Sequence, residues 1–118
     1  MYNNQFSKVD NENVLLYGAD DAGEIALRWI LRNPSMGYSV AGFLDDDSLK
    51  WGKNIHGIKI LGNVDTLVRC IQEKNVTGVI AMTETSLRST EGEKLVSTCR
   101  ANGIWVRVLH FEFELKDI

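Results

Sequence analysis

The chain has 118 residues, 44% of them hydrophobic and 25% charged, which is typical of one globular domain with a sizeable core. Its 13 Lys and Arg against 16 Asp and Glu give a net charge of -3, so we expect no general attraction to nucleic acid or to an anionic bilayer. No apolar run approaches the roughly 20 residues of a membrane span, and residues 1–13 lack the apolar core of a signal peptide. We therefore expect a cytoplasmic domain that is a piece of a larger protein.

The first elements expected along the chain are a strand and a helix joined by a glycine turn. Residues 1–12 are polar and are predicted to form a flexible lead-in. Residues 14–17 form a continuous apolar run closed by Gly18, the pattern of a strand buried on both faces. Between residues 21 and 33 the apolar positions recur at helical spacing, and Pro34 ends the predicted helix.

The rest of the chain alternates strands with helices. Apolar runs predict strands at residues 38–44, 58–61, 78–82 and 104–109, and a glycine-punctuated loop is expected at residues 48–57. Asn63 is the expected N-cap of a helix that ends near Lys74. Thr90 and Glu93 suggest a capping box for a last helix, which Gly103 is placed to end.

This alternation predicts an α/β, doubly wound, Rossmann-like domain over residues 13–118. Parallel strands joined by right-handed crossovers leave few arrangements, and we expect a five-stranded parallel sheet of order 3-2-1-4-5. In that order the winding reverses between the first and fourth strands, where open α/β sheets bind their ligands. The loops at residues 18–23, 45–47 and 83–88 are expected to meet there.

The turn between the first strand and helix has the context of a phosphate site. Free amides and the positive end of the helix dipole face whatever lies over such a turn, and glycines at its two ends allow close packing. The dinucleotide fingerprint has glycine at the third position, where this chain has Asp20. A purely structural role in capping the helix is the alternative for Asp20 and Asp21. The candidate cofactor-binding residues of this turn are Gly18, Ala19, Asp20, Asp21, Ala22 and Gly23.

Four further candidates follow the second and fourth strands. Asp45 and Asp46 lie where a Rossmann acid accepts hydrogen bonds from a ribose, although three consecutive aspartates also suit a solvated turn. Thr83 and Ser86 could bind a phosphate or sugar from the other side of the crevice, and ordinary loop composition predicts the same hydroxyls.

No residue set in the chain suggests catalysis or metal binding. Cys70 and Cys99 fall in predicted helices outside any zinc-type spacing, so we expect two reduced, buried thiols. His56 and His110 have no Cys or His neighbour in the sequence that would form a metal cluster, and no Tyr-x-x-x-Lys pair occurs. We therefore expect no turnover from the chain by itself.

Four segments in order, LLYGADDAGEIALRWI, GYSVAGFLDDD, GKNIHGIKILG and CRANGIWVRVL, resemble a known domain type. It is the nucleotide-binding, CoA-binding-like domain of bacterial polysaccharide-biosynthesis proteins of the nucleotide-sugar dehydratase and epimerase family. Similar domains precede some polyprenyl-phosphate sugar transferases, and sugar acyltransferases carry a similar GFLDDD segment. The family turn usually has the form GAGxAG, from which Asp20 departs.

The resemblance implies a parent with a membrane region, anchored to the inner membrane, and a separate catalytic 4,6-dehydratase or epimerase domain. In that reading this chain is a non-catalytic domain that binds NAD(P) or a UDP-sugar, and its partners are the nucleotide or nucleotide-sugar, the rest of the parent and, as an open possibility, a second copy. The alternatives are an NAD(P)-dependent oxidoreductase fragment acting on a UDP-sugar, a nucleotide-sensing domain of a sugar transferase, and an empty structural connector.

Overall fold

Six strands form one sheet in the computed structural model, which describes residues 11–111 and 114–118. Their order is β3-β4-β2-β1-β5-β6. Every pairing in this sheet is parallel except that between β3 and β4. The strands are β1 (Glu12–Tyr17), β2 (Tyr38–Leu44), β3 (Asn54–Ile55), β4 (Ile58–Gly62), β5 (Val76–Ala81) and β6 (Trp105–Val108).

The five parallel strands have the predicted order, and the sixth strand corrects the prediction of a purely parallel, five-stranded sheet. β3 lies in the segment expected to be a loop and pairs with β4 as a short hairpin. The hairpin turn consists of His56 and Gly57, with φ angles of 48° and 82°. Two consecutive positive φ angles are what a tight two-residue hairpin requires. β1 also begins at Glu12, inside the predicted lead-in, of which residues 1–10 lie outside the described residues.

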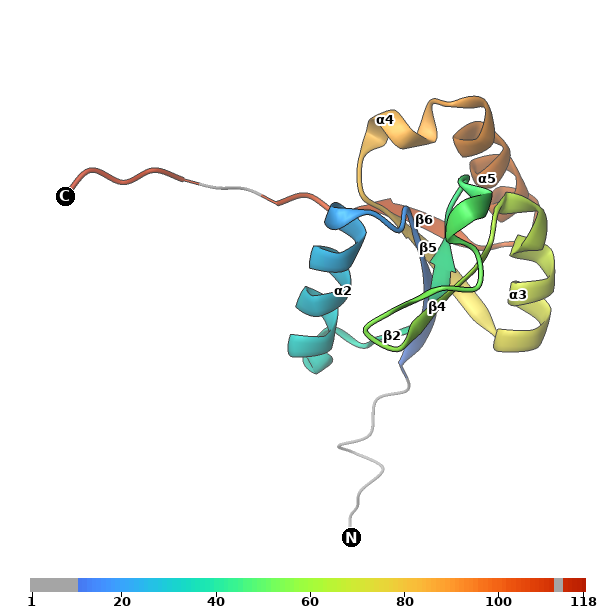
Figure 1. The fold of residues 1–118 in the computed structure, drawn as a ribbon, viewed down its shortest axis with the longest axis horizontal. Coiled ribbons are helices and arrows are strands. Elements are labelled where there is room, and N and C mark those ends of the chain that lie inside the picture. The colour runs from blue at the N-terminus through green and yellow to red at the C-terminus, as the bar shows by residue number, and fades with distance from the viewer. Residues whose placement is uncertain (1–10, 112–113) are drawn as a thin grey trace, which may run out of the picture.

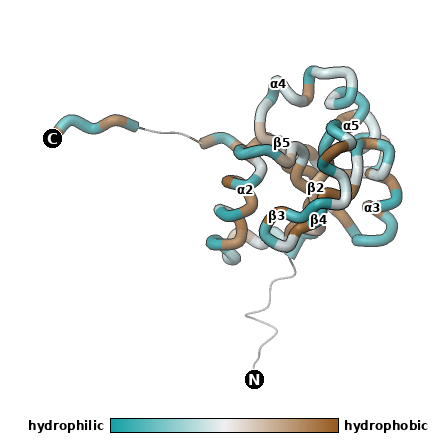
Figure 2. The backbone as a smooth tube through the Cα atoms, in the orientation of Figure 1, coloured by the Kyte–Doolittle hydropathy of each residue, from teal (hydrophilic) through white to brown (hydrophobic). Residues whose placement is uncertain are grey.

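The helices lie in two layers, one on each face of the sheet. Figure 1 shows α2 on one side of the strands and α3 and α5 on the other. Figure 2 shows the hydrophobic strands between them, with hydrophilic residues on the outer turns. The helices are α2 (Asp21–Arg32), α3 (Leu67–Lys74), α4 (Glu84–Leu87) and α5 (Thr90–Ala101), and the short 3-10 turns are η1 (Pro34–Met36), η2 (Ser48–Lys50) and η3 (Val64–Thr66).

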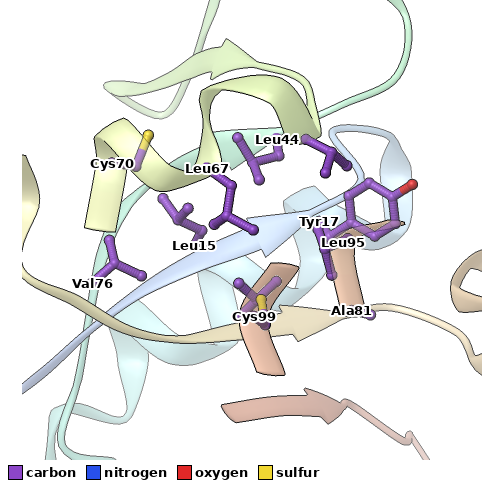
Figure 3. Packing of buried hydrophobic residues seen from close by; sticks show 11 residues of the cluster. Leu15, Tyr17, Leu44, Leu67, Cys70, Val76, Ala81, Leu95 and Cys99 are labelled. Carbon is purple, nitrogen blue, oxygen red and sulfur yellow. The ribbon is translucent and has the colours of Figure 1, made fainter. Parts of the chain in front are cut away.

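Alternate residues of β1 supply the core on both faces of the sheet. Val14 and Leu16 pack on the α2 side, while Leu15 and Tyr17 pack on the side of α3 and α5. This alternation follows from the twofold period of a strand and explains why the run is apolar throughout. Figure 3 shows the second side, where both predicted thiols, Cys70 and Cys99, are buried and free.

Two predicted helix starts need correction. Asn63 caps η3 rather than an α-helix, since its side chain accepts from the Asp65 amide and the α-helical turns begin only at Leu67. Ser89, not Thr90, caps α5, because the Ser89 hydroxyl accepts a hydrogen bond from the Gly92 amide at 3.0 Å. None of the helices in the described ranges is long and apolar enough to cross a bilayer.

Candidate functional site

The turn after β1 is held by two glycines. Gly18 has a φ of +113°, a conformation that side chains other than hydrogen disfavour. Its amide donates to the carbonyl oxygen of Leu44 at 2.8 Å, which ties the turn to the end of β2. At Gly23 a Cβ would lie 2.0 Å from the Gly18 carbonyl oxygen. Both glycines therefore let the first turn of α2 close onto the strand.

Asp20 is the N-cap of α2. Its Oδ1 accepts a hydrogen bond from the Gly23 amide at 3.2 Å, and its carbonyl oxygen accepts from Glu24 at 2.9 Å. Asp20 therefore has the helix-capping role that the sequence analysis gave as the alternative to ligand binding. Asp21 and Glu24 add negative charge to the first turn, where the helix dipole stabilises it.

Asp45 joins the end of β2 to the turn. Its Oδ2 accepts from the Ala19 amide at 2.7 Å and its Oδ1 from the Asp47 amide at 2.8 Å. The Nζ atom of Lys50 lies 3.6 Å from the same Oδ2 and donates to the Ala19 carbonyl oxygen at 3.3 Å. Both carboxylate oxygens of Asp45 therefore already have partners within the protein.

Asp46 faces a different partner. The Tyr17 hydroxyl donates to its carboxylate, with distances of 3.0 Å to Oδ1 and 2.9 Å to Oδ2. Burial raises the pKa of Tyr17 strongly, and the bond to Asp46 raises it further. Figure 3 places this hydroxyl at the rim of the core on the α3 and α5 side. Asp46 is thus engaged away from the glycine turn.

Thr83 and Ser86 form the start of α4. The Thr83 Oγ1 accepts from the Ser86 amide at 3.1 Å, and the Ser86 hydroxyl donates to the Thr83 carbonyl oxygen at 2.8 Å. These contacts cap a short helix. Of the three loops expected to meet, those at residues 18–23 and 45–47 are joined by hydrogen bonds. Near Gly18 on the other side lies the side chain of Met82, the residue before the third loop.

A cavity of about 550 Å³ lies over the first turn of α2. The β3-β4 hairpin is tied to α2 beside it, since the His56 Nε2 lies 2.9 Å from the Glu24 Oε2. The cavity is lined by Ala19, Asp20, Asp21, Ala22, Glu24, Lys50 and Ile55.

The cavity brings together four of the predicted residues and adds three that the sequence analysis did not single out. Lys50 is the most consequential addition, because it is the one lysine or arginine among the described residues that line the cavity. It comes from η2, and nothing in the spacing of the sequence indicates that this turn brings a lysine back to the glycine turn. His56 has a charged partner, which its isolation in the sequence did not suggest.

The described residues that line the cavity offer backbone hydrogen-bond donors, carboxylates and the ammonium group of Lys50. They include no nucleophile paired with a general base. In the described part of the chain, no three His, Cys, Asp or Glu side chains are grouped to hold a metal ion. Burial raises the pKa of Cys99 to about 11 and also raises that of Cys70. Both thiols lie in the core on the α3 and α5 side of the sheet.

A protein family and a curated protein are similar to the chain in sequence. The family described as PglD N-terminal domain matches residues 13–95. The probable polysaccharide biosynthesis protein EpsC of Bacillus subtilis (strain 168) is 24% identical over 103 residues, which is 86% of this chain and 17% of EpsC. The chain therefore spans about a sixth of that curated relative.

Two solved structures share the fold. UDP-D-quinovosamine 4-dehydrogenase from Vibrio fischeri superposes with a TM-score of 0.71 at 20% identity, over 85% of this chain and 79% of that one. RSP, a Rex-family repressor, superposes in its complex with β-NADH with a TM-score of 0.68 at 16% identity, over 92% of this chain and 50% of that one. At these identities the likeness establishes a Rossmann-like fold.

Proposed function

The chain belongs to the PglD N-terminal domain family, and from this premise we propose that it is a non-catalytic domain that binds a nucleotide or nucleotide-sugar. The observation that carries the proposal is the cavity of about 550 Å³ over the first turn of α2, with Lys50 at its wall. The relative EpsC supports a setting in polysaccharide biosynthesis. Ligands of open α/β sheets bind at this end of the strands.

The first turn of α2 supplies donors for a phosphate group. The amides of Asp21 and Ala22 are among those that a helix cannot pair internally, and both residues line the cavity. Lys50 adds a positive charge. A phosphate placed over the turn would meet amides, the helix dipole and this ammonium group together.

The same cavity limits the affinity. Asp20 occupies the Gly23 amide with its own carboxylate, and Asp21 and Glu24 also line the cavity. Three carboxylates near one lysine repel an anionic ligand. We therefore expect dissociation constants in the micromolar to millimolar range for NAD+, NADP+ or a UDP-sugar, far weaker than nanomolar.

The proposed parent carries the chemistry elsewhere. Because the chain spans 17% of EpsC, a dehydratase or epimerase activity would belong to a separate catalytic domain, and a membrane region would anchor the whole protein on its cytoplasmic side. The competing proposal is an empty structural connector. It is favoured by the internal partners that Asp20, Asp45 and Asp46 already have.

Titration of the isotope-labelled chain followed by amide NMR tests the proposal. NAD+, NADP+ and UDP-N-acetylglucosamine are added separately, and we expect one of them to shift the amides of residues 19–24 in a saturable way. Absence of saturable shifts with all three at millimolar concentration would favour the connector. Conversion of a UDP-hexose by the chain alone, followed by chromatography, would overturn the non-catalytic role.

A further inference from the structure

The outer face of α2 is unusually apolar for a helix that faces solvent. Ile25 is 52% exposed and Trp29 is 38% exposed, and the two lie one turn apart on the same face of the helix. Trp29 packs edge-on against Phe111, with ring centroids 6.2 Å apart and planes at 77°. Together they border a groove of about 300 Å³ between α2 and the segment that follows β6. The α2 groove is lined by Ile25, Arg28, Trp29, Arg32, Asn33 and Phe111.

The α2 groove is positively charged in a protein that is negative overall. Arg28 and Arg32 line it, and among residues 11–111 and 114–118 no acidic one does, whereas the chain carries a net charge of -3. Apolar rings beside two arginines suit an occupant that is itself apolar and acidic. Exposed aromatic and arginine residues of this kind are also the types enriched where proteins bind one another.

The C-terminal segment of the chain has the complementary character. Residues 114–118 carry two large apolar side chains, Leu115 and Ile118. Residues 114–118 also contain two acidic residues and one basic residue, a net charge of 1 - 2 = -1. Leu115 and Ile118 are fully exposed, at 104% and 117%.

We propose that residues 114–118 of one copy of this chain bind in the α2 groove of a second copy, and that two such contacts form a symmetric dimer. Each copy then supplies one segment and one groove, which closes the assembly. The segment does not bind in its own groove in this structure, since Phe111 forms a wall of that groove and residues 114–118 extend away from the body in Figure 1. The apolar side chains would enter beside Trp29 while the acidic ones meet the arginines.

Sedimentation equilibrium of the full 118-residue chain tests the proposal. We expect a dimer that Leu115→Asp weakens by about tenfold or more, since a charge then replaces the buried apolar anchor. Arg28→Glu combined with Arg32→Glu should weaken it similarly. Leu49→Asp is the control, because Leu49 is 79% exposed and lies outside the groove. Circular dichroism establishes that each variant is folded.

Mixing the two defective proteins separates this contact from any other. The Leu115→Asp protein keeps its groove and the arginine variant keeps its segment, so an equimolar mixture should form a heterodimer through one intact contact. A chain that is monomeric at all concentrations would overturn the proposal. So would a dimer that resists both sets of substitutions.

A cross-link distinguishes a contact between copies from one within a copy. In a protein carrying Ile25→Cys and Ile118→Cys, mild oxidation should yield covalent dimers on a non-reducing gel, while Cys70 and Cys99 stay buried. A disulfide formed within one chain at high dilution would mean that the segment folds back onto its own groove, and the proposal would be wrong.

Discussion

The starts of α2 and α5 use the same local device and differ in what lies beside them. At α2 the Asp20 side chain accepts from the Gly23 amide, and at α5 the Ser89 side chain accepts from the Gly92 amide. In both, a glycine three residues after the cap faces a backbone oxygen, 2.0 Å from where a Cβ would lie. A polar cap followed by a glycine is therefore a packing device and not by itself evidence of a ligand.

The surroundings separate the two helix starts. The first turn of α5 packs on the carbonyl oxygen of Ser86 at the end of α4, so a neighbouring helix covers it. The first turn of α2 borders the cavity instead, with Lys50 and the β3-β4 hairpin around it. The open space and the cation distinguish the candidate site, and the glycine pattern alone does not.

The largest expected effect tests the shared device. Gly23→Ala and Gly92→Ala should each lower the free energy of unfolding by about 1 to 3 kcal/mol, because the new methyl group meets a backbone oxygen that cannot move aside easily. Urea denaturation of both variants measures this. Only Gly23→Ala should also reduce ligand binding. A variant as stable as the natural chain would mean that the helix can shift away from the strand at no cost.

The difference between the two regions is tested through two lysines. Lys50→Met should weaken binding of a nucleotide or UDP-sugar by about tenfold, since it removes the positive charge from a cavity lined by carboxylates. Lys94→Met is the matched control, because Lys94 pairs with Asp65 on the surface of α5. Calorimetric titration compares the two. Equal affinities for all three proteins would show that Lys50 serves only to hold Asp45.

Much of this arrangement follows from the sequence. The order of the parallel strands follows from the apolar runs and from the handedness of crossovers, and the capping role of Asp20 was one of two roles that residue type allowed. The residues that sequence reasoning missed depend on the path of the chain over residues 46–57. His56 adopts a positive φ without a signal in its residue type, and Lys50 reaches the turn only because η2 folds back.

Thr83 and Ser86 show another limit of sequence reasoning. Hydroxyl residues after a strand are expected both in a ligand loop and in a helix cap, so composition could not decide between them. The structure has them in the cap of α4. The role of Asp46 could not be predicted from the sequence either, because its hydrogen-bond partner, Tyr17, lies 29 positions away in the chain.

Stability at alkaline pH tests the buried hydroxyl of Tyr17, which lies between Asp46 after β2 and Ser89 at the start of α5. Its hydroxyl bonds to Asp46, and the nearby Ser89 lowers the pKa that burial and Asp46 raise. Tyr17 and Cys99 therefore keep their protons in the folded chain, with the pKa of Cys99 at about 11 against 9.0 normally. In the unfolded chain both ionise at lower pH, so stability that is present below pH 9 should fall as pH rises from 9 to 11.

Between pH 9 and 11 the free energy of unfolding should fall by about 1 kcal/mol per pH unit. Tyr17→Phe should remove the part of the loss that develops above pH 10, and it should cost about 1 kcal/mol at pH 7 through the lost bond to Asp46. Tyr38→Phe is the control, since its hydroxyl bonds to Arg107 on the exposed surface. Urea denaturation from pH 7 to 11 measures all three proteins, and a flat stability profile for the natural chain would contradict the linkage.

The smallest expected effect decides whether Asp20 opposes a ligand or only caps α2. At an effective dielectric near 20, two unit charges about 6 Å apart repel by roughly 3 kcal/mol, and screening at an exposed turn reduces this to about 1 kcal/mol, a factor of about five in affinity. Asp20→Gly removes that charge and frees the Gly23 amide, while stability should fall by only a few tenths of a kcal/mol. Asp20→Ser should keep the cap and give most of the gain in affinity. Ser89→Gly, which removes the equivalent cap of α5, should leave affinity unchanged. If titration of NAD+, NADP+ and UDP-sugars finds every affinity of Asp20→Gly unchanged or weaker, the turn does not hold a phosphate, and the empty connector becomes the better account of this domain.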